Sequence, residues 1–450
     1  MSEEEGANCD DCVPFGLPRA RRAGARLAAS ERKPSPLKSV GVSPARRAAY
    51  GVIRRVFEEG AYADRALRSA AQGLDDRERA LAQQLAYGTV QRVRTLDHAV
   101  ESLGGRSVET LDPPVLAALR LGAYQLGYLE GVTDYAAVNE AVELVRAAGL
   151  GRAAGFTNAV LRRVAEGVEP LLASLPEELP EEAALRHSYP DWVASTWWHV
   201  LGADGARALM RAQNEPAETV VRINRRKRGA VAGRPDQELP DALHVERVDE
   251  EAVADGLIWP QSRGSQLAGL VVGSCEGERT LDLCAAPGGK ATQLAGAVVA
   301  VEKHPGRTRE LRDNVRRLGA TNVTVVEADA LALPAGLTGF DHVLVDAPCS
   351  GFGVLASRPD LRWRAQELPE LQSALLHEAA QHVKPGGTIV YAVCTINPRE
   401  NEAIVERSGL AVDPLGDEWP QFRHPHRPEF LLTLPHVHRT SGFFIARLRA

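Results

Sequence analysis

Apolar positions divide this chain into a region with a helical period and a later region in which short strands alternate with helices. From residue 45 to residue 167, apolar side chains recur at spacings of three and four, the period of an amphipathic helix. The clearest runs cover 49–57, 81–86, 115–121 and 138–145, with glycine and proline breaks between them. We therefore predict that this region is all-helical.

The pattern changes after residue 259 to short β-type runs separated by amphipathic segments. One predicted helix covers 307–318, where Leu311, Val315 and Leu318 share a face and Gly319 can cap the end. The predicted strands cover 279–283, 298–302, 322–326, 342–345, 388–393 and 443–448. Strands that alternate with helices predict a mostly parallel, doubly wound sheet. The predicted fold class is an all-α N-terminal domain followed by a Rossmann-like α/β domain, with a small linking α+β subdomain.

These patterns divide the chain into four segments. Residues 1–43 lack an apolar period and contain several prolines, so we expect a flexible basic arm. We assign 44–170 to the helical domain and 171–259 to the linking subdomain, in which a Trp-rich helix opens near Asp191. Residues 260–450 form the α/β domain, and a chain of 450 residues agrees with two or three domains.

Composition narrows the class of protein. Charged residues make up 25% of the chain and hydrophobic residues 44%, which is the balance of a soluble globular protein. No apolar run approaches the roughly 18 residues that a membrane span needs, and the acidic N-terminus differs from a secretion signal. We therefore expect a cytoplasmic monomer with no membrane partner.

The net charge hides a local excess of basic residues. The formal net charge is −6, which argues against a surface built wholly for nucleic acid. Between residues 19 and 47, however, nine Lys and Arg residues accompany a single acid, Glu31. Such an arm either binds phosphate backbones or only solubilises the chain, and the sequence leaves both readings open. A second basic cluster at 222–228, which includes Arg222, is expected at a groove rim or in an exposed loop.

Six cysteines in so long a chain do not make a disulfide framework, so reduced thiols are expected. Cys9 and Cys12 have metal-clip spacing, but no second pair of ligands lies nearby, and we expect no metal site there. Four histidines lie among prolines and arginines, which favours a surface loop over a metal site: His424, His426, His436 and His438.

Two cysteines each follow a predicted strand. Cys349 lies in the stretch 345–351, Val-Asp-Ala-Pro-Cys-Ser-Gly, and Cys394 in the stretch 391–395, Tyr-Ala-Val-Cys-Thr. Both should emerge where ligands bind in open α/β folds, at the carboxyl end of a strand. A cysteine in such a place is either a small buried apolar residue or a nucleophile. The two motifs favour covalent chemistry.

A glycine-containing loop follows the first predicted strand. Residues 284–290 read Cys284, Ala285, Ala286, Pro287, Gly288, Gly289 and Lys290, and a helix is expected from Ala291. The spacing matches neither the dinucleotide fingerprint nor a Walker loop, and Ala291 lacks the hydroxyl that a Walker loop requires. Carboxylates close the later strands at Glu302, Asp329 and Asp346, and the first two are placed to reach a ribose and an adenine. Together these features outline a site for a cationic nucleoside.

These motifs resemble the RNA cytosine-C5 methyltransferases of the Sun family. The resemblance covers residues 183–450 and rests on the glycine-containing loop, the two cysteine motifs, and Arg358-Pro359-Asp360 with Trp363. The stretches 222–224 and 441–444 resemble flanking motifs, although the family usually has Asp where this chain has Ser441. The helical part resembles the NusB-type RNA-binding domain, chiefly over 134–140 and 156–162. Their combination is the architecture of bacterial small-subunit rRNA methyltransferases.

The resemblance implies a mechanism. Cys394 matches the nucleophile that attacks carbon 6 of cytosine, Cys349 matches the residue that helps to release the product, and Asp346 would contact the base. S-adenosylmethionine would lie over 284–290 and beside Asp346, with Glu302 on its ribose and Asp329 on its adenine. The implied partner is small-subunit rRNA outside the mature ribosome.

Two alternatives to an rRNA methyltransferase stay open. One is a tRNA target for the same chemistry. The other is a non-catalytic RNA-binding assembly or antitermination factor, against which the retention of both cysteines argues.

Overall fold

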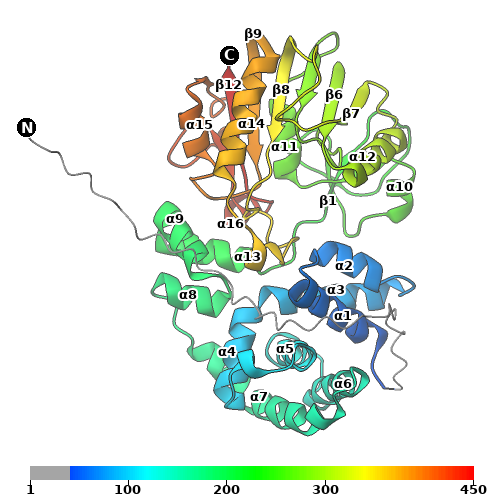
Figure 1. Ribbon diagram of the computed structural model, residues 1–450, viewed down its shortest axis with the longest axis vertical. Helices are drawn as coiled ribbons and strands as arrows, with labels where there is room; N and C mark the ends of the chain where they lie inside the picture. The colour runs from blue at the N-terminus through cyan, green and yellow to red at the C-terminus, as the bar shows by residue number, and fades with distance from the viewer. Residues whose placement is uncertain (1–40) are drawn as a thin grey trace, which may run out of the picture. The chain divides into compact units, whose positions relative to one another are not determined.

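The computed structural model describes residues 41–450 (Figure 1). The expected basic arm over 1–43 lies outside the described residues except for its last three, and Cys9 and Cys12 lie outside them as well. The N-terminal region of the described chain is helical. Its elements are α1 (Pro44–Glu59), α2 (Ala63–Ala70), α3 (Asp76–Gln91), α4 (Val93–Gly104), η1 (Val108–Thr110), α5 (Pro113–Tyr128), α6 (Asp134–Ala147), η2 (Gly151–Ala153) and α7 (Ala154–Ser174).

Local sequence signals explain where these helices begin and end. Pro44 occupies the first turn of α1, where its missing N–H breaks no helical hydrogen bond. Gly60 ends α1 with φ of 68°, a left-handed conformation that glycine adopts without strain. The helices share one buried apolar core, and α5 approaches α7 closely at Gly122, where a Cβ would lie 2.7 Å from Leu161. A helical domain with the predicted period is therefore present.

The linking part contains three helices and a small antiparallel sheet. The chain runs through α8 (Pro180–His187) and α9 (Asp191–Ala212), and α9 bends at Gly202. The sheet has the strand order β2-β3-β1-β4. Its strands and short helix are β1 (Val220–Ile223), β2 (Arg234–Pro235), β3 (Ala242–His244), α10 (Glu250–Ala254) and β4 (Ile258–Pro260).

An eight-stranded sheet forms the centre of the C-terminal part (Figure 1). Its strands are β5 (Arg279–Asp282), β6 (Ala297–Glu302), β7 (Val323–Glu327), β8 (Phe340–Asp346), β9 (Val383–Val393), β10 (Ala411–Asp413), β11 (Leu431–Thr433) and β12 (Phe443–Arg449). The order is β10-β12-β9-β8-β5-β6-β7, and β11 pairs with β12. The strands from β9 to β7 are parallel, and β12 is antiparallel to β9. The order reverses between β5 and β8, which is where such sheets bind ligands.

Both faces of this sheet are covered. The helices are α11 (Arg263–Val271), α12 (Pro305–Leu318), α13 (Leu361–Arg364), α14 (Pro369–His382), α15 (Glu402–Ser408), η3 (Pro420–Phe422) and α16 (Pro435–His438). In β8, Val343 and Val345 pack in one core with Leu376 of α14, whereas Leu344 packs in the other with Leu267 of α11. Burial on both faces explains why these strands read as continuous apolar runs.

The prediction of a helix after the glycine-containing loop is wrong. Residues 291–293 form a turn and 294–296 are irregular, and β6 begins at Ala297. The chain between the loop and β6 is too short for a helix that must also return to the start of a parallel strand. The six predicted strands are all present, and β9 begins earlier than expected, at Val383. Among residues 41–450, no helix combines the length and apolar character that crossing a membrane requires.

Candidate active site

Two thiols meet at the carboxyl edge of the large sheet. Cys349 lies three residues beyond the end of β8, and Cys394 follows the last residue of β9 directly. The two strands are parallel neighbours in which Asp346 pairs with Ala392, so their following loops start side by side. The Sγ atoms lie 3.4 Å apart, and both side chains are partly exposed. A hydrogen bond joins two groups that are 45 residues apart in the chain.

A cation and a carboxylate lie beside the thiols. Lys290 donates from Nζ to Oδ2 of Asp346 at 2.7 Å, and its Nζ lies 5.0 Å from the ring centroid of Phe443. The hydrogen bond from Cys349 lowers the pKa of the Cys394 thiol, and the Lys290 ammonium acts in the same direction. That hydrogen bond and burial both raise the pKa of Cys349. The pair therefore favours a Cys394 thiolate that accepts a hydrogen bond from a Cys349 thiol.

A buried carboxylate, Glu400, holds the loops of both cysteines. Its Oε1 accepts from the backbone N–H of Ser350 at 3.0 Å and its Oε2 from the Ser350 hydroxyl. The Ser350 hydroxyl also lies 2.7 Å from that of Thr395, the residue after Cys394. The Glu400 carboxylate further accepts from Gln372 Nε2 at 3.0 Å and from the Leu368 N–H at 3.1 Å.

Sequence reasoning missed Glu400, because the sequence does not reveal that Ser350 and Glu400 meet across 50 residues. The only available signal was its place in the polar stretch 397–402 that follows the second cysteine motif.

The glycine-containing loop is held from outside by three side chains, each bound to a different loop carbonyl. Arg307 Nη2 donates to the Ala286 oxygen at 2.8 Å, Asn314 Nδ2 to the Pro287 oxygen at 2.9 Å, and Arg222 Nη2 to the Gly289 oxygen at 3.1 Å. Gly288 has φ of 110°, and a Cβ on Gly289 would lie 2.8 Å from Nε1 of Trp259. The two glycines are therefore required by backbone conformation and by close packing respectively.

Arg222 corrects an expectation. We expected it at a groove rim or in an exposed loop, but its side chain is buried and donates to Gln261, Gly289 and Thr292. Burial lowers the pKa of Arg222 to about 10, and the nearby Arg226 adds to this effect. Its position in a short strand of the linking sheet explains the difference, because β1 packs against the loop that follows β5.

Three carboxylates surround the loop at the ends of neighbouring strands. Glu302 is the last residue of β6, is buried, and pairs with Arg307 at 3.4 Å. Asp329 does not end a strand, as we had expected; it lies two residues past β7, half-exposed and 3.9 Å from Lys303. The fully buried Asp282 ends β5 and was missed as a site residue, although its place at a strand end was a usable signal. Burial, with the charge of Asp346, raises the pKa of Asp282 to about 7.

Cys284, the first residue of the loop, differs from the paired thiols. Burial raises the pKa of its thiol well above the usual range, and Asp282 adds to this effect. Its backbone N–H donates to Asp282 Oδ1 at 3.3 Å. An un-ionised thiol of this kind is a poor nucleophile, so the loop offers backbone groups rather than reactive sulfur.

The segment that contains Arg358 and Trp363 contacts the helical region. The buried guanidinium of Arg362 donates to the Gln91 carbonyl at 2.8 Å and to the Tyr189 hydroxyl at 2.9 Å. Trp363 Nε1 donates to the Val90 carbonyl at 2.6 Å. The chain between Cys349 and α14 therefore fixes the α/β part to helix α3.

The four histidines do not gather around a common point. His424 is buried and pairs with Glu402 at 2.7 Å, so it is not in the surface loop that we expected. His438 accepts a hydrogen bond at Nδ1 from the Leu434 N–H at 2.8 Å. Among residues 41–450, no group of three or more His, Cys, Asp or Glu side chains is arranged to hold a metal ion.

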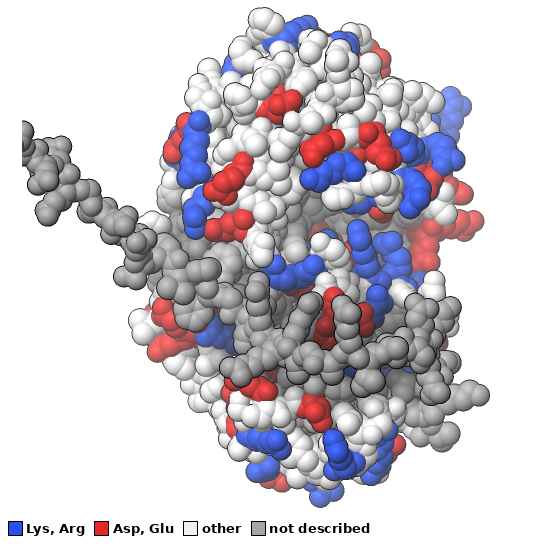
Figure 2. Space-filling view, in the orientation of Figure 1, with Lys and Arg blue, Asp and Glu red and all other residues white. Residues whose placement is uncertain are grey.

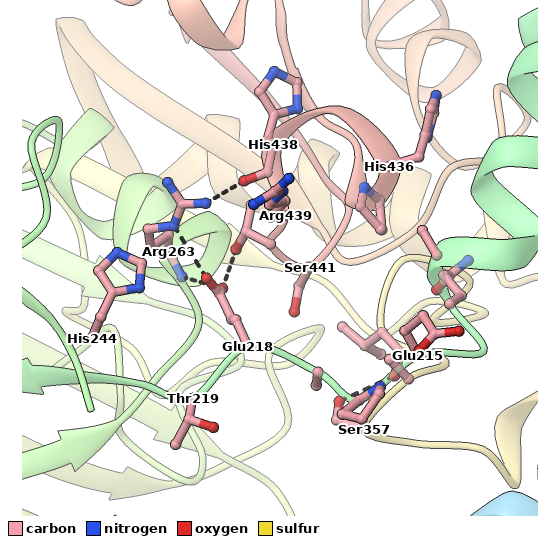
Figure 3. A pocket seen from close by; sticks show the side chains of 18 of the residues that line it. Glu215, Glu218, Thr219, His244, Arg263, Ser357, His436, His438, Arg439 and Ser441 are labelled. Atoms are coloured by element: carbon pink, nitrogen blue, oxygen red, sulfur yellow. Dashed lines mark hydrogen bonds and ion pairs between the residues drawn. The ribbon is translucent and has the colours of Figure 1, made fainter. Parts of the chain in front are cut away.

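A cavity of about 840 Å³, whose lining includes Glu218, Arg263 and Ser441, is seen in Figure 3. We call it the junction cavity, because the linking part and the α/β part both line it. Its walls come from 212–219, 234–245, 353–357 and 435–441, together with Arg263 at the start of α11.

Comparisons with known proteins agree with this architecture. A family model described as 16S rRNA methyltransferase RsmB/F matches residues 270–449, and a NusB family model matches residues 43–166. The probable ribosomal RNA small subunit methyltransferase B of Synechocystis sp. is 34% identical over 447 residues, covering 90% of this chain and 99% of that protein. The ribosomal RNA small subunit methyltransferase B of Escherichia coli is 30% identical over 428 residues, covering 88% and 96%.

Solved structures support the same fold. The crystal structure of PH0851 superposes with a TM-score of 0.77 at 25% identity and covers 92% of this chain and all of that one. A methyltransferase homolog protein from Pyrococcus horikoshii gives a TM-score of 0.52 at 26% identity, covering 60% of this chain and 98% of that one. The predicted fold class, an all-α region followed by an α/β methyltransferase domain, is confirmed.

Proposed function

The chain belongs to the RsmB/F family of 16S rRNA methyltransferases, and from this premise we propose that it methylates carbon 5 of a cytosine in small-subunit rRNA. The observation that carries the proposal is the pair of sulfur atoms 3.4 Å apart beside the Lys290–Asp346 ion pair. Two thiols in one site are unnecessary for methylating an amine, which already has a lone pair. They are useful where carbon must be made nucleophilic and then freed.

Cys394 acts as the nucleophile. Carbon 5 of cytosine is too weak a nucleophile to accept a methyl group directly, so a thiolate must first add to carbon 6 and create an enamine. The lowered pKa of Cys394 supports this role, because the thiolate is the reactive form. Asp346 holds the N3 edge of the base: as sulfur adds, N3 takes up a proton from solvent and its N–H donates to the Asp346 carboxylate, so that no negative charge builds up on the ring.

Cys349 assists release. After carbon 5 has accepted the methyl group, its proton passes to solvent water while the bond between carbon 6 and the Cys394 sulfur breaks, which restores the aromatic ring and the Cys394 thiolate. The raised pKa of Cys349 keeps a proton on this sulfur, 3.4 Å from the departing one, where it can stabilise the thiolate that leaves. The two thiols thus divide attack and release.

S-adenosylmethionine is the methyl donor in this proposal, and its sulfonium supplies the methyl group. The loop 284–290 provides glycine backbone for close approach, with Glu302 for the ribose and Asp329 for the adenine. The residues fit a nucleoside ligand, because three carboxylates lie around the loop: Glu302, Asp329 and Asp346, each paired with a base. Asp282 Oδ2 is also buried without a hydrogen-bond partner among the described residues, so an acceptor is available.

The helical domain over 44–170 serves as an RNA-binding domain in this proposal. Figure 2 shows basic and acidic side chains interspersed over the face in view, rather than one broad basic surface. Recognition therefore depends on local contacts, and the target base must be single-stranded or flipped out of a helix to reach the thiols.

The proposal is tested by trapping the covalent intermediate. Cys349→Ala, incubated with S-adenosylmethionine and precursor small-subunit rRNA, should accumulate a protein–RNA adduct that survives denaturing electrophoresis. Adding Cys394→Ala should abolish the adduct. The exposed Cys275 lies outside the site, so Cys275→Ala is the matched control and should behave as wild type.

Three outcomes contradict the proposal in different ways. An adduct in the double variant would show that Cys394 is not the nucleophile. Methylation of tRNA but not of rRNA would change the substrate. Absence of methyl transfer by the wild type to any RNA would favour a binding protein.

A further inference from the structure

A pocket of about 300 Å³ lies where the helical domain meets helices α8 and α9, and we call it the arginine pocket. Its lining contains three arginines, Arg92, Arg186 and Arg211, and one carboxylate, Glu215. Arg92 lies at the start of α4, Arg186 in the last turn of α8 and Arg211 in the last turn of α9. Basic side chains from three helices therefore line one pocket outside the site of the paired thiols.

The three arginines act on the same neighbouring groups. The Arg92 guanidinium lies 4.7 Å from the ring centroid of Tyr128. Burial raises the pKa of Tyr128, and the charges of Arg92 and Arg186 both act against this rise. Burial, with smaller contributions from the charges of Arg92 and Arg211, lowers the pKa of His187 to about 4. Tyr128 and His187 both line the pocket, so the three cations gather around it, and the His187 ring is neutral at pH 7.

The nearby carboxylates do not neutralise these arginines. Glu177 accepts a hydrogen bond from Arg211 and lies 3.6 Å from Arg186, so a single carboxylate serves two arginines. Glu215 is exposed and forms no ion pair with any residue in 41–450. The side chain of Arg92 forms neither a hydrogen bond nor an ion pair with any of these residues. Positive charge is therefore in excess at the pocket.

A fourth guanidinium, that of Arg362, adds to this excess behind the pocket wall. It is fully buried and donates to neutral acceptors, among them the Ser188 carbonyl at 3.0 Å and Asn214 Oδ1 at 2.9 Å. Asn214 donates in turn to the carbonyl of His187 at 2.9 Å. Burial lowers the pKa of Arg362 to about 10, and the charge of Arg92 contributes.

No carboxylate within 41–450 pairs with Arg362, and its Nε has no hydrogen-bond partner among the same residues. Buried charges are normally paired, because an isolated charge is costly to remove from water. An anion in the neighbouring pocket would offset this cost. The pocket and the buried guanidinium behind it therefore favour the same kind of ligand.

The pocket is connected with the catalytic site through the end of α9. Gln213, two residues beyond Arg211, is buried and donates from Nε2 to the Phe352 carbonyl at 2.9 Å. Its Oε1 accepts from the Leu355 N–H at 3.1 Å. Both contacts hold the chain that follows Cys349. The end of α9 that carries Arg211 therefore also fixes the loop of a catalytic thiol.

We propose that the arginine pocket binds one phosphate group of the rRNA backbone and so fixes the RNA relative to the paired thiols. The inference rests on the proposed function, because it names a second part of the same RNA that the protein binds. Arginine suits this task, because its planar guanidinium can donate to two phosphate oxygens at once. The volume is at the lower end of the range of about 300 to 1,000 Å³ that is usual for ligand sites, which suits a single phosphate and its ribose.

The test is the salt dependence of binding between a 16S rRNA fragment and the double variant Arg92→Gln/Arg211→Gln. Glutamine keeps the start of each side chain and removes the charge. We expect the dissociation constant to rise about tenfold, because charge-assisted hydrogen bonds are lost. The slope of log affinity against log salt should become shallower by about 1. KM for RNA should rise in parallel while kcat stays near that of wild type.

Matched variants separate this contact from general effects of charge and folding. Arg407→Gln removes an exposed arginine of α15 outside the pocket and should bind RNA as wild type does. Arg92→Gln alone breaks no ion pair and should still weaken binding, whereas Arg92→Lys keeps the charge and should weaken it less. Wild-type thermal unfolding and S-adenosylmethionine binding show that a variant is folded. An equal loss in Arg407→Gln would overturn the proposal.

A second measurement locates the phosphate in the RNA. Single phosphates of the fragment are replaced by neutral methylphosphonates, one at a time. One replacement should weaken binding to wild type as much as the double substitution does, and should leave the double variant unaffected. If no position shows this non-additive result, the pocket does not bind a backbone phosphate.

Inorganic phosphate tests a different source of the same anion. Thermal unfolding is compared in phosphate and in chloride at equal ionic strength. If phosphate stabilises wild type but not the double variant, and both bind RNA with the same affinity and salt slope, the pocket takes a free anion and the proposal is wrong.

Failure of this inference differs from failure of the proposed function. If wild type methylates RNA and the double variant keeps its KM, affinity and salt slope, only the inference fails. If wild type methylates no RNA, the proposed function fails. The binding measurements need no turnover and still decide whether the pocket contacts RNA.

Discussion

The loops of Cys349 and Cys394 start from neighbouring parallel strands and carry the same side chain, yet their neighbours differ. The hydrogen bond from Cys349 and, to a lesser extent, the Lys290 ammonium lower the pKa of Cys394, whereas the same hydrogen bond, burial and the Glu400 carboxylate raise the pKa of Cys349. One thiol therefore tends to lose its proton and the other to keep it. The difference shows that position on the sheet makes both residues available, and that the hydrogen bond between them, together with the surrounding charges, gives them different pKa values.

Removing the positive charge of Lys290 should have the largest effect on the difference between the two thiols. In Lys290→Met the pKa of Cys394 rises and Asp346 loses its partner, so we expect kcat/KM for methyl transfer to fall by about 10³-fold. Lys290→Arg keeps the charge and should retain more activity. Near-normal activity in Lys290→Met would mean that the cation does not distinguish the two thiols.

Removing the negative charge of Glu400 tests the environment of Cys349. Glu400→Gln replaces an acceptor of several hydrogen bonds, so the Cys349 loop should shift and kcat should fall about 10²-fold with little change in KM. The pKa of Cys349 should also fall, which alkylation in a Cys394→Ala background can measure.

Glu367→Gln is the control, because Glu367 contacts Asn397 at 2.7 Å in the same region without touching Ser350. Equal losses in both variants would indicate a general packing effect.

Asp282 sharpens the comparison, because its charge state affects the Lys290–Asp346 pair. Its pKa of about 7 lies above that of an exposed aspartate, so its contribution to stability is present at low pH and is lost as pH rises through 7. Between about pH 4 and pH 7 the free energy of unfolding should fall with a slope of up to about 1.4 kcal/mol per pH unit from this group. Urea unfolding of Asp282→Asn should lack this component, and an unchanged pH profile would contradict the assignment.

The hydrogen bond between the thiols, the largest cause of the lowered pKa of Cys394, can be tested without turnover. In Cys349→Ala, Cys394 loses its hydrogen-bond donor, so the pH midpoint of its alkylation by iodoacetamide should move upward. Cys349→Ser keeps a donor and should move it less. Mass spectrometry of the Cys394 peptide gives the midpoint, and a downward shift would show that Cys394 is the donor of the pair.

Much of the fold could be predicted because the local pattern of apolar and polar side chains indicates which positions are buried. Apolar runs such as 342–345 and 388–393 are buried on both faces of the sheet, and the helical spacing before residue 167 matches helices that share one core. The failed prediction, the helix from Ala291, came from extending a usual strand–loop–helix pattern. The short distance to β6 prevented it, and strand boundaries are hard to locate from sequence alone.

The candidate site also contains features that the sequence predicts and features that it does not. The sequence by itself determined that Cys349, Cys394 and Asp346 lie at strand ends, because a strand end is a local property. Only the tertiary structure decided that the two thiols share one hydrogen bond, that Arg222 is buried against the glycine-containing loop, and that Glu400 holds the loop of Cys349. These features depend on distances of about 3 Å between groups 45 to 67 residues apart in the chain, and charge interactions vary steeply over such distances.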